Sequence, residues 1–245
     1  MKNTSFGALL YREFLLTKKN TLMTIFSVTL FIVVCLLISL STQIGNLSKA
    51  EEGLKDLFLT TRLMGIYCSA FLIFIAGEGT AKDAISKPWK LFRKSSPVSP
   101  WKLSLVKYTY YFIAMAVSIA FAGIYLMADS AITGKAVEFS DFAMLAFMLA
   151  AALLLQIALS VALQFSGSKD KAGIAMVVIV FSIMVPAMTW IQNNSIIPQN
   201  ATPKETLEII RSLSLTAFPF VCMIIAALYV IGFVVTALLY KRREK

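Results

Sequence analysis

The chain has no histidine, only three cysteines and few charged residues, since Asp, Glu, Lys and Arg together make up 15% of its 245 residues. Cys35, Cys68 and Cys222 are odd in number and lack the spacing of metal ligands, so we expect neither a disulfide framework nor a zinc site. Without histidine no Ser–His dyad can form, and no acidic pair lies within the apolar stretches, which argues against an intramembrane protease. No G-x-x-x-x-G-K-S/T phosphate loop occurs either, so we expect any ATP hydrolysis on a separate polypeptide.

Long apolar runs are abundant instead. Hydrophobic residues make up 58% of the chain, and the mean hydropathy is +0.78. Six apolar stretches are each long enough to cross a hydrocarbon core of about 30 Å as a helix of about 20 residues. The sequence therefore predicts an all-α, polytopic integral membrane protein with one transmembrane domain over 1–245. Its predicted spans are about 21–41, 57–77, 105–127, 142–165, 172–191 and 217–240.

The basic residues indicate how the protein sits in the membrane. Most of the 23 lie in the N-terminal segment, the second and fourth loops and the C-terminal tail. By the positive-inside rule, these segments and both termini face the cytoplasm, and we expect a bacterial cytoplasmic membrane protein. Because the surplus of positive charge is confined to one side, the net charge of +10 is explained by anionic lipids and membrane insertion. We expect no nucleic-acid partner.

An amphipathic pattern precedes the first span. It predicts a helix over about 4–18 that lies on the membrane surface, with a turn into the bilayer at Lys18, Lys19 and Asn20. An N-terminal extension of the first span is the alternative. The apolar residues of the pattern are Phe6, Leu9, Leu10 and Phe14.

Two loops contain helix signals. The cytoplasmic loop 78–104 can form a short helix with aromatic residues among basic ones, and Pro97 and Pro100 stop any helix there. A basic loop that only anchors to anionic headgroups is the alternative. In the outer loop 192–216, Thr202 and Pro203 resemble an N-cap followed by proline at the first helical position. They predict a short helix at the outer interface, with a plain surface loop as the alternative.

Charge is nearly absent from the predicted spans. We expect Arg62, near the outer end of the second span, to extend toward the headgroups. The lack of ionisable groups at the midplane argues against proton- or sodium-coupled transport and favours an apolar or amphipathic substrate. Small residues spaced by four predict close helix packing, most simply within the chain. They are Ala114, Ser118 and Ala122 in the third span and Ala158, Ala162 and Ser166 in the fourth.

Several of these features together resemble the permease subunits of type-2 ATP-binding-cassette (ABC) exporters. Two glycines flank Glu78 at the end of the second span, and an amphipathic segment, a Ser-Pro-Val-Ser sequence at 96–99 and Lys107-Tyr108 follow. The resemblance also extends to the six spans, the N-terminal helix and the inward-facing termini. It implies that the second loop contains a coupling helix that docks on the ATPase subunit.

The resemblance implies specific roles and partners. The coupling segment would be Lys87 to Ser96, with Trp89 and Phe92 as apolar anchors and with Lys87, Leu91, Arg93 and Glu78 as further coupling residues. Two copies of an ABC ATPase would bind ATP and Mg, a second permease chain would complete the pathway, and this chain would bind no cofactor. The expected cargo is an amphipathic or antimicrobial peptide or a hydrophobic drug. The alternatives are a non-transporting membrane scaffold or immunity protein and, less favoured, an ion-coupled carrier.

Overall fold

The computed structural model describes residues 5–44, 52–74, 98–166 and 203–244, with a few single residues between 174 and 189. Within these ranges the chain is helical and contains no strand. Among the described residues, four helices are long and apolar enough to cross a membrane, α1, α5, α6 and α8, whereas the apolar part of α2 and η2 is shorter. The elements are α1 (Phe6–Ile44), α2 (Glu52–Ala70), the 3-10 turn η2 (Phe71–Ile73), α5 (Pro100–Thr133), α6 (Phe139–Ser166) and α8 (Pro203–Glu244).

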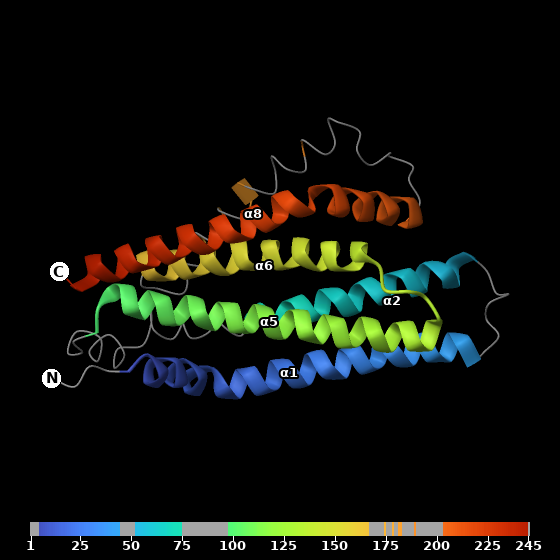
Figure 1. The fold of residues 1–245 in the computed structure, drawn as a ribbon, viewed down its shortest axis with the longest axis horizontal. Helices are drawn as coiled ribbons and strands as arrows, with labels where there is room; N and C mark the ends of the chain where they lie inside the picture. The colour runs from blue at the N-terminus through green and yellow to red at the C-terminus, as the bar shows by residue number, and fades with distance from the viewer. Residues whose placement is uncertain are drawn as a thin grey trace.

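The helices lie roughly parallel or antiparallel to one another, and both chain ends are at the same end of the bundle (Figure 1). We call this the termini end and the opposite one the far end. Helices α1 and α5 run toward the far end, while α2, α6 and α8 run back (Figure 1). By their contacts the helices divide into a first group of α1, α2 and α5 and a second group of α6 and α8.

Local sequence signals explain the limits of α5. Ser99 has an extended backbone, and its side chain accepts a hydrogen bond from the backbone N–H of Lys102 at 3.3 Å, which makes it the N-cap. Pro100 follows at the first helical position, where its missing N–H costs nothing. At the other end Gly134 takes a left-handed conformation, with φ of 69°, and its N–H donates to the carbonyl of Ser130.

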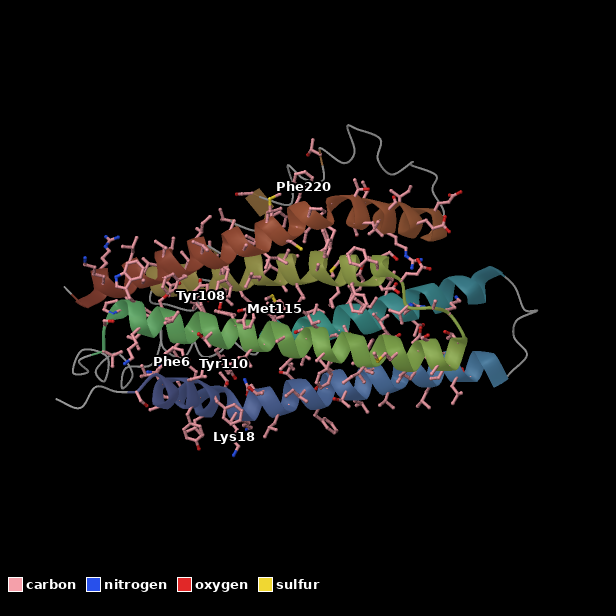
Figure 2. The ribbon with its side chains drawn as sticks, viewed as in Figure 1. Phe6, Lys18, Tyr108, Tyr110, Met115 and Phe220 are labelled. Atoms are coloured by element: carbon pink, nitrogen blue, oxygen red, sulfur yellow. The ribbon has the colours of Figure 1, made fainter. Side chains whose placement is uncertain are left out.

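Helix α1 is continuous and does not turn at residues 18–20. The prediction of a separate interfacial helix over about 4–18 is therefore wrong, and the extension of the first span is what forms. The Thr17 hydroxyl donates to the carbonyl of Glu13 at 3.0 Å and lies 2.7 Å from the Tyr110 hydroxyl of α5. The polar residues at the expected turn are thus accommodated within a helix, and Lys18 points away from the bundle (Figure 2).

Helix α8 begins at Pro203, as the sequence predicts, but it is not a short separate helix. It continues through the sixth predicted span to Glu244, so the predicted interruption before residue 217 is wrong. Pro219 lies within it, and Figure 1 shows the helix changing direction along its length, close to the labelled Phe220 in Figure 2. A bend is expected there because proline removes one helical hydrogen bond.

The predicted spans are confirmed in part. The first, third, fourth and sixth lie within α1, α5, α6 and α8, each of which is longer than predicted. The second, 57–77, is helical as far as residue 74. The fifth, 172–191, lies outside the described residues except for single positions, as does most of the outer loop up to residue 202.

The small residues predicted to mediate packing do so within the chain. On α5, Ala114, Ser118 and Ala122 are all buried, and on α6 so are Ala158 and Ala162. Short side chains let the helix axes approach closely, which strengthens dispersion contacts where no water is displaced. The resulting core occupies the space between α1, α2, α5 and α6.

Candidate functional site

At the termini end the two helix groups are joined by aromatic packing between α5 and α8. The ring of Tyr108, only 2% exposed, meets the rings of Tyr229 and Phe233 edge-on, at centroid distances of 5.2 and 6.0 Å. The Tyr229 hydroxyl donates to the Tyr108 carbonyl, and the Tyr108 hydroxyl lies 3.4 Å from Thr236 Oγ1. Gly232 permits this approach, because an added Cβ would overlap the Tyr108 hydroxyl. This joint is apolar, interlocked and closely packed.

Charged side chains at the same end are also buried. Lys107, one of the residues that carry the family resemblance, is 4% exposed. Its Nζ lies 5.9 Å from the ring centroid of Tyr240. On α1, Glu13 is 2% exposed and pairs with Arg12. Such burial of charge near a helix end is compatible with a membrane protein because the apolar stems lie in the core while the charged heads are paired or stacked.

Val98, the first residue described after the range 75–97, is buried in the bundle. Val98 is buried in a cluster with Leu9 of α1, Leu103 and Val106 of α5 and Tyr240 of α8. This cluster therefore combines a residue of the predicted loop with residues from both helix groups.

The predicted coupling residues themselves lie outside the described residues. This applies to the range 75–97 as a whole. Their roles stay predictions. They are Glu78, Lys87, Trp89, Leu91, Phe92 and Arg93.

Loss of the α5 cap should loosen this attachment. We expect Ser99→Ala to cost about 1 kcal/mol of local helix stability, because the N–H of Lys102 loses its acceptor. Hydrogen exchange followed by mass spectrometry should show faster exchange in the first turn of α5. Ser212→Ala is the control, because the Ser212 hydroxyl donates to a carbonyl within α8 and caps nothing. Equal exchange in the wild type and Ser99→Ala would contradict the assigned cap.

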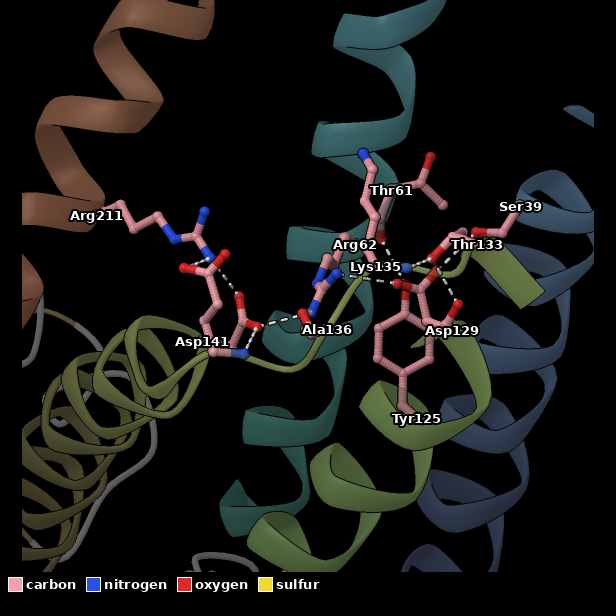
Figure 3. A network of polar contacts seen from close by, with 11 residues as sticks. Ser39, Thr61, Arg62, Tyr125, Asp129, Thr133, Lys135, Ala136, Asp141 and Arg211 are labelled. Atoms are coloured by element: carbon pink, nitrogen blue, oxygen red, sulfur yellow. Dashed lines mark hydrogen bonds and ion pairs between the residues drawn. The ribbon is translucent and has the colours of Figure 1, made fainter. Parts of the chain in front are cut away.

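At the far end, ion pairs between side chains connect the two helix groups. Arg62 of α2 is 9% exposed, and its Nη2 lies 2.7 Å from Asp141 Oδ2 of α6 and donates to the carbonyl of Ala136 at 3.1 Å (Figure 3). Its Nη1 lies 3.6 Å from Asp129 Oδ2 of α5. The expectation that Arg62 extends toward the headgroups is therefore wrong. Two buried carboxylates hold it inside the bundle because pairing offsets the cost of burying its charge.

Asp141 accepts from both arginines of the network. Besides Arg62, its Oδ1 lies 3.4 Å from Nη2 of Arg211 on α8. The same Arg211 nitrogen lies 2.9 Å from Glu138 Oε2, and its Nε donates to Ser140 Oγ at 2.6 Å. Asp141 also accepts from the backbone N–H of Glu138 at 3.1 Å, so it is fixed in the first turn of α6.

Asp129 holds the first group together around Arg62. Its Oδ1 accepts from the Ser39 hydroxyl of α1 at 3.0 Å, and its carbonyl accepts from the Thr133 hydroxyl at 2.7 Å. Nearby, the Tyr125 hydroxyl donates to the carbonyl of Thr61 at 3.1 Å and so links α5 to α2. Figure 3 shows these contacts meeting at one end of the bundle.

A polar cavity of about 360 Å³ lies within this network. Its lining brings three cations and three carboxylates together, so the cavity as a whole is close to neutral. The other four lining residues, Leu63, Thr133, Ala136 and Met144, are uncharged. The charged residues that line it are Arg62, Lys135, Arg211, Asp129, Glu138 and Asp141.

A second hollow is apolar and lies between the two helix groups. It has a volume of about 520 Å³ and lies between α2 with η2 on one side and α6 on the other. Aromatic and methionine side chains dominate its lining, and they can rearrange around ligands of different shape. We call it the apolar groove; its residues are Met64, Tyr67, Cys68, Ala70, Phe71, Phe74, Met148, Ala151, Ala152 and Leu155.

The sequence analysis missed the buried carboxylates at the far end. The expectation that no acidic pair is buried is wrong: Asp129 and Asp141, just beyond the predicted spans 105–127 and 142–165, are 3% and 4% exposed. A usable signal existed: Arg62 is a cation within an apolar stretch, and such a residue requires a partner at the same depth. Both acids lie beside the short 134–138 connection, at the end of the bundle that Arg62 reaches.

The fold and these features define an integral membrane protein built from long apolar helices. The chain belongs to the ABC-2 family transporter proteins, whose family pattern matches residues 55–241, more than half of the chain. The resemblance noted in the sequence is thereby confirmed, and the chain is a membrane-transport component. No curated protein and no solved structure matches the chain significantly.

Proposed function

We propose that this chain is the transmembrane permease subunit of an ABC exporter, driven by ATP hydrolysis on a separate nucleotide-binding subunit. Family membership over residues 55–241 carries the proposal. The sequence itself contains no phosphate loop. In the working assembly a second permease chain, identical or not, completes the pathway, and two ATPase subunits bind ATP and Mg.

The helix directions support a six-span arrangement with both termini in the cytoplasm of a bacterial cell. Helices α6 and α8 both run toward the termini end, so the chain leaves Ser166 at one end and enters Pro203 at the other (Figure 1). A fifth crossing over about 172–191 supplies the return. The basic residues then assign the termini end to the cytoplasm and the far end to the outside.

The apolar groove supports an amphipathic or hydrophobic cargo, with a cytotoxic or antimicrobial peptide or a drug favoured. Its lining has no fixed charge, so it provides no site for a sugar or an ion. It also lies on the boundary between the helix groups, where relative motion would change its width. Loss of resistance to one substrate class in a strain lacking this chain is the expected phenotype.

The second loop is proposed to transmit force from the ATPase. Trp89 and Phe92 would fill pockets on the ATPase surface, since apolar anchors in pockets dominate binding energy. The buried cluster around Val98 supports this role because it connects the end of the loop to α1, α5 and α8.

We expect Trp89→Ala to uncouple ATP hydrolysis from transport while leaving the fold intact, and Phe92→Ala to do the same. The complex is purified in mild detergent with the candidate ATPase encoded beside this chain, and ATPase rate and transport are compared. Trp190→Ala, at the end of the predicted fifth span, is the matched control and should stay coupled. Full coupling in both loop variants would reject the assigned segment, and failure to bind any ATPase would favour a membrane scaffold.

A further inference from the structure

We infer that the Arg62–Asp141 ion pair is a releasable closure between the two helix groups at the far end of the bundle. The inference rests on the proposed exporter function, because a closure is needed only if the far end opens. The ion pairs around Arg62 have no part in the proposed coupling through the second loop, and closure of the far end would be their role.

The two ends of the boundary between the groups differ in chemistry. At the termini end, bulky rings and hydrogen bonds interlock α5 and α8 around Tyr108. At the far end, residues of both groups line a polar cavity, and two of them, Arg62 and Asp141, form an ion pair at 2.7 Å. The apolar groove lies along the same boundary, between α2 and α6. Separation at the far end would therefore widen the groove while the aromatic joint stays closed.

Each member of the pair has a second partner of opposite charge within its own group. Arg62 can remain with Asp129 of α5, 3.6 Å away, and Asp141 can remain with Arg211 of α8, 3.4 Å away. Separation of the groups thus leaves neither charge alone. An unpaired buried ion costs several kcal/mol, and this arrangement avoids most of that cost. Stability of the closed bundle alone does not require that the second partners, Asp129 and Arg211, lie in different helix groups.

Distance measurements in the assembled exporter test the inference. We would attach nitroxide labels at Met127 of α5 and Leu213 of α8, which are exposed and lie in different groups. The control pair is Met127 and Leu40 of α1, both exposed and within the first group. Pulsed electron paramagnetic resonance in lipid nanodiscs, with the ATPase subunits bound, compares the nucleotide-free, ATP-bound and vanadate-trapped states.

We expect the Met127–Leu213 distance to lengthen in at least one nucleotide state while the Met127–Leu40 distance stays constant. Asp141→Asn should populate the longer distance without nucleotide, with the control distance again showing that the first group is intact. If Met127–Leu213 stays constant while the complex hydrolyses ATP and transports a fluorescent amphipathic peptide, the inference is overturned and the proposed function stands. If the complex has no ATPase activity that depends on this chain, the proposed function and the inference fail together.

Discussion

Replacing Arg62 by methionine is expected to lower the free energy of unfolding by about 3–5 kcal/mol, because removal of one partner leaves buried carboxylates uncompensated. Asp129 is the more affected of the two. It is 3% exposed, and Arg62 Nη1 lies 3.6 Å from its Oδ2. Asp141 keeps Arg211. Equilibrium unfolding in mixed detergent micelles, followed by circular dichroism, would measure the change.

Arg211→Met is the matched control for this substitution. The Arg211 side chain is 30% exposed, and its partner Glu138 is 61% exposed, so that pair is expected to contribute about 0–1 kcal/mol. Asp141, which Arg211 also contacts, keeps Arg62 in this variant. A double variant sharpens the test. Arg62→Met with Asp129→Asn should be more stable than Arg62→Met alone, since it removes the orphaned charge. Equal losses for both arginines, or simple additivity in the double variant, would show that burial of the ions does not dominate this network.

Replacing Gly65 by alanine is expected to destabilise the protein by about 1–3 kcal/mol through overpacking. An added Cβ would overlap the ring of Tyr125, which is fully buried and tied to Thr61 by its hydroxyl. Because the ring is itself rigid and fully buried, either the ring or the α2 and α5 backbones would have to shift. Thermal unfolding in detergent should show a lower midpoint than in the wild type.

Gly123→Ala on α5 provides the comparison, because an added Cβ there meets nothing within 4 Å. We expect it to change stability by less than about 1 kcal/mol, in the direction of the higher helix propensity of alanine. Shortening the obstructing ring should rescue the first variant. Gly65→Ala in a Tyr125→Leu background should cost much less than in the wild type, and an unchanged cost would mean that the clash is not the cause.

The positions of helix boundaries show where sequence signals are sufficient. Pro203 begins α8, as the Thr202-Pro203 pattern predicts. Pro100, read from the sequence only as a helix stop, instead occupies the first turn of α5 behind the Ser99 N-cap. Sequence signals were not sufficient where a polar segment is compatible with both a turn and a continuous helix. A turn was predicted at Lys18, Lys19 and Asn20, but α1 continues through them. The Thr17 hydroxyl just before them donates to a carbonyl of α1 and lies 2.7 Å from the Tyr110 hydroxyl of α5. A partner 93 residues away cannot be inferred from spacing along one helix.

The sequence by itself determined that this is an all-helical membrane protein, because the length of the apolar stretches and the distribution of the basic residues are properties of the chain read locally. The residues around Glu78, the Ser-Pro-Val-Ser sequence and Lys107-Tyr108 carried the resemblance to type-2 ABC permeases. Burial of backbone polar groups in lipid leaves helices as the simplest solution for such runs. Only the tertiary structure decided which charges meet. Arg62, Asp129 and Asp141 lie on three helices and come together at 2.7 and 3.6 Å because the chain reverses direction between them. Pairing across helices depends on their relative rotation and depth, which no local pattern specifies. It places Arg62, expected near the headgroups, in a buried contact between the two helix groups.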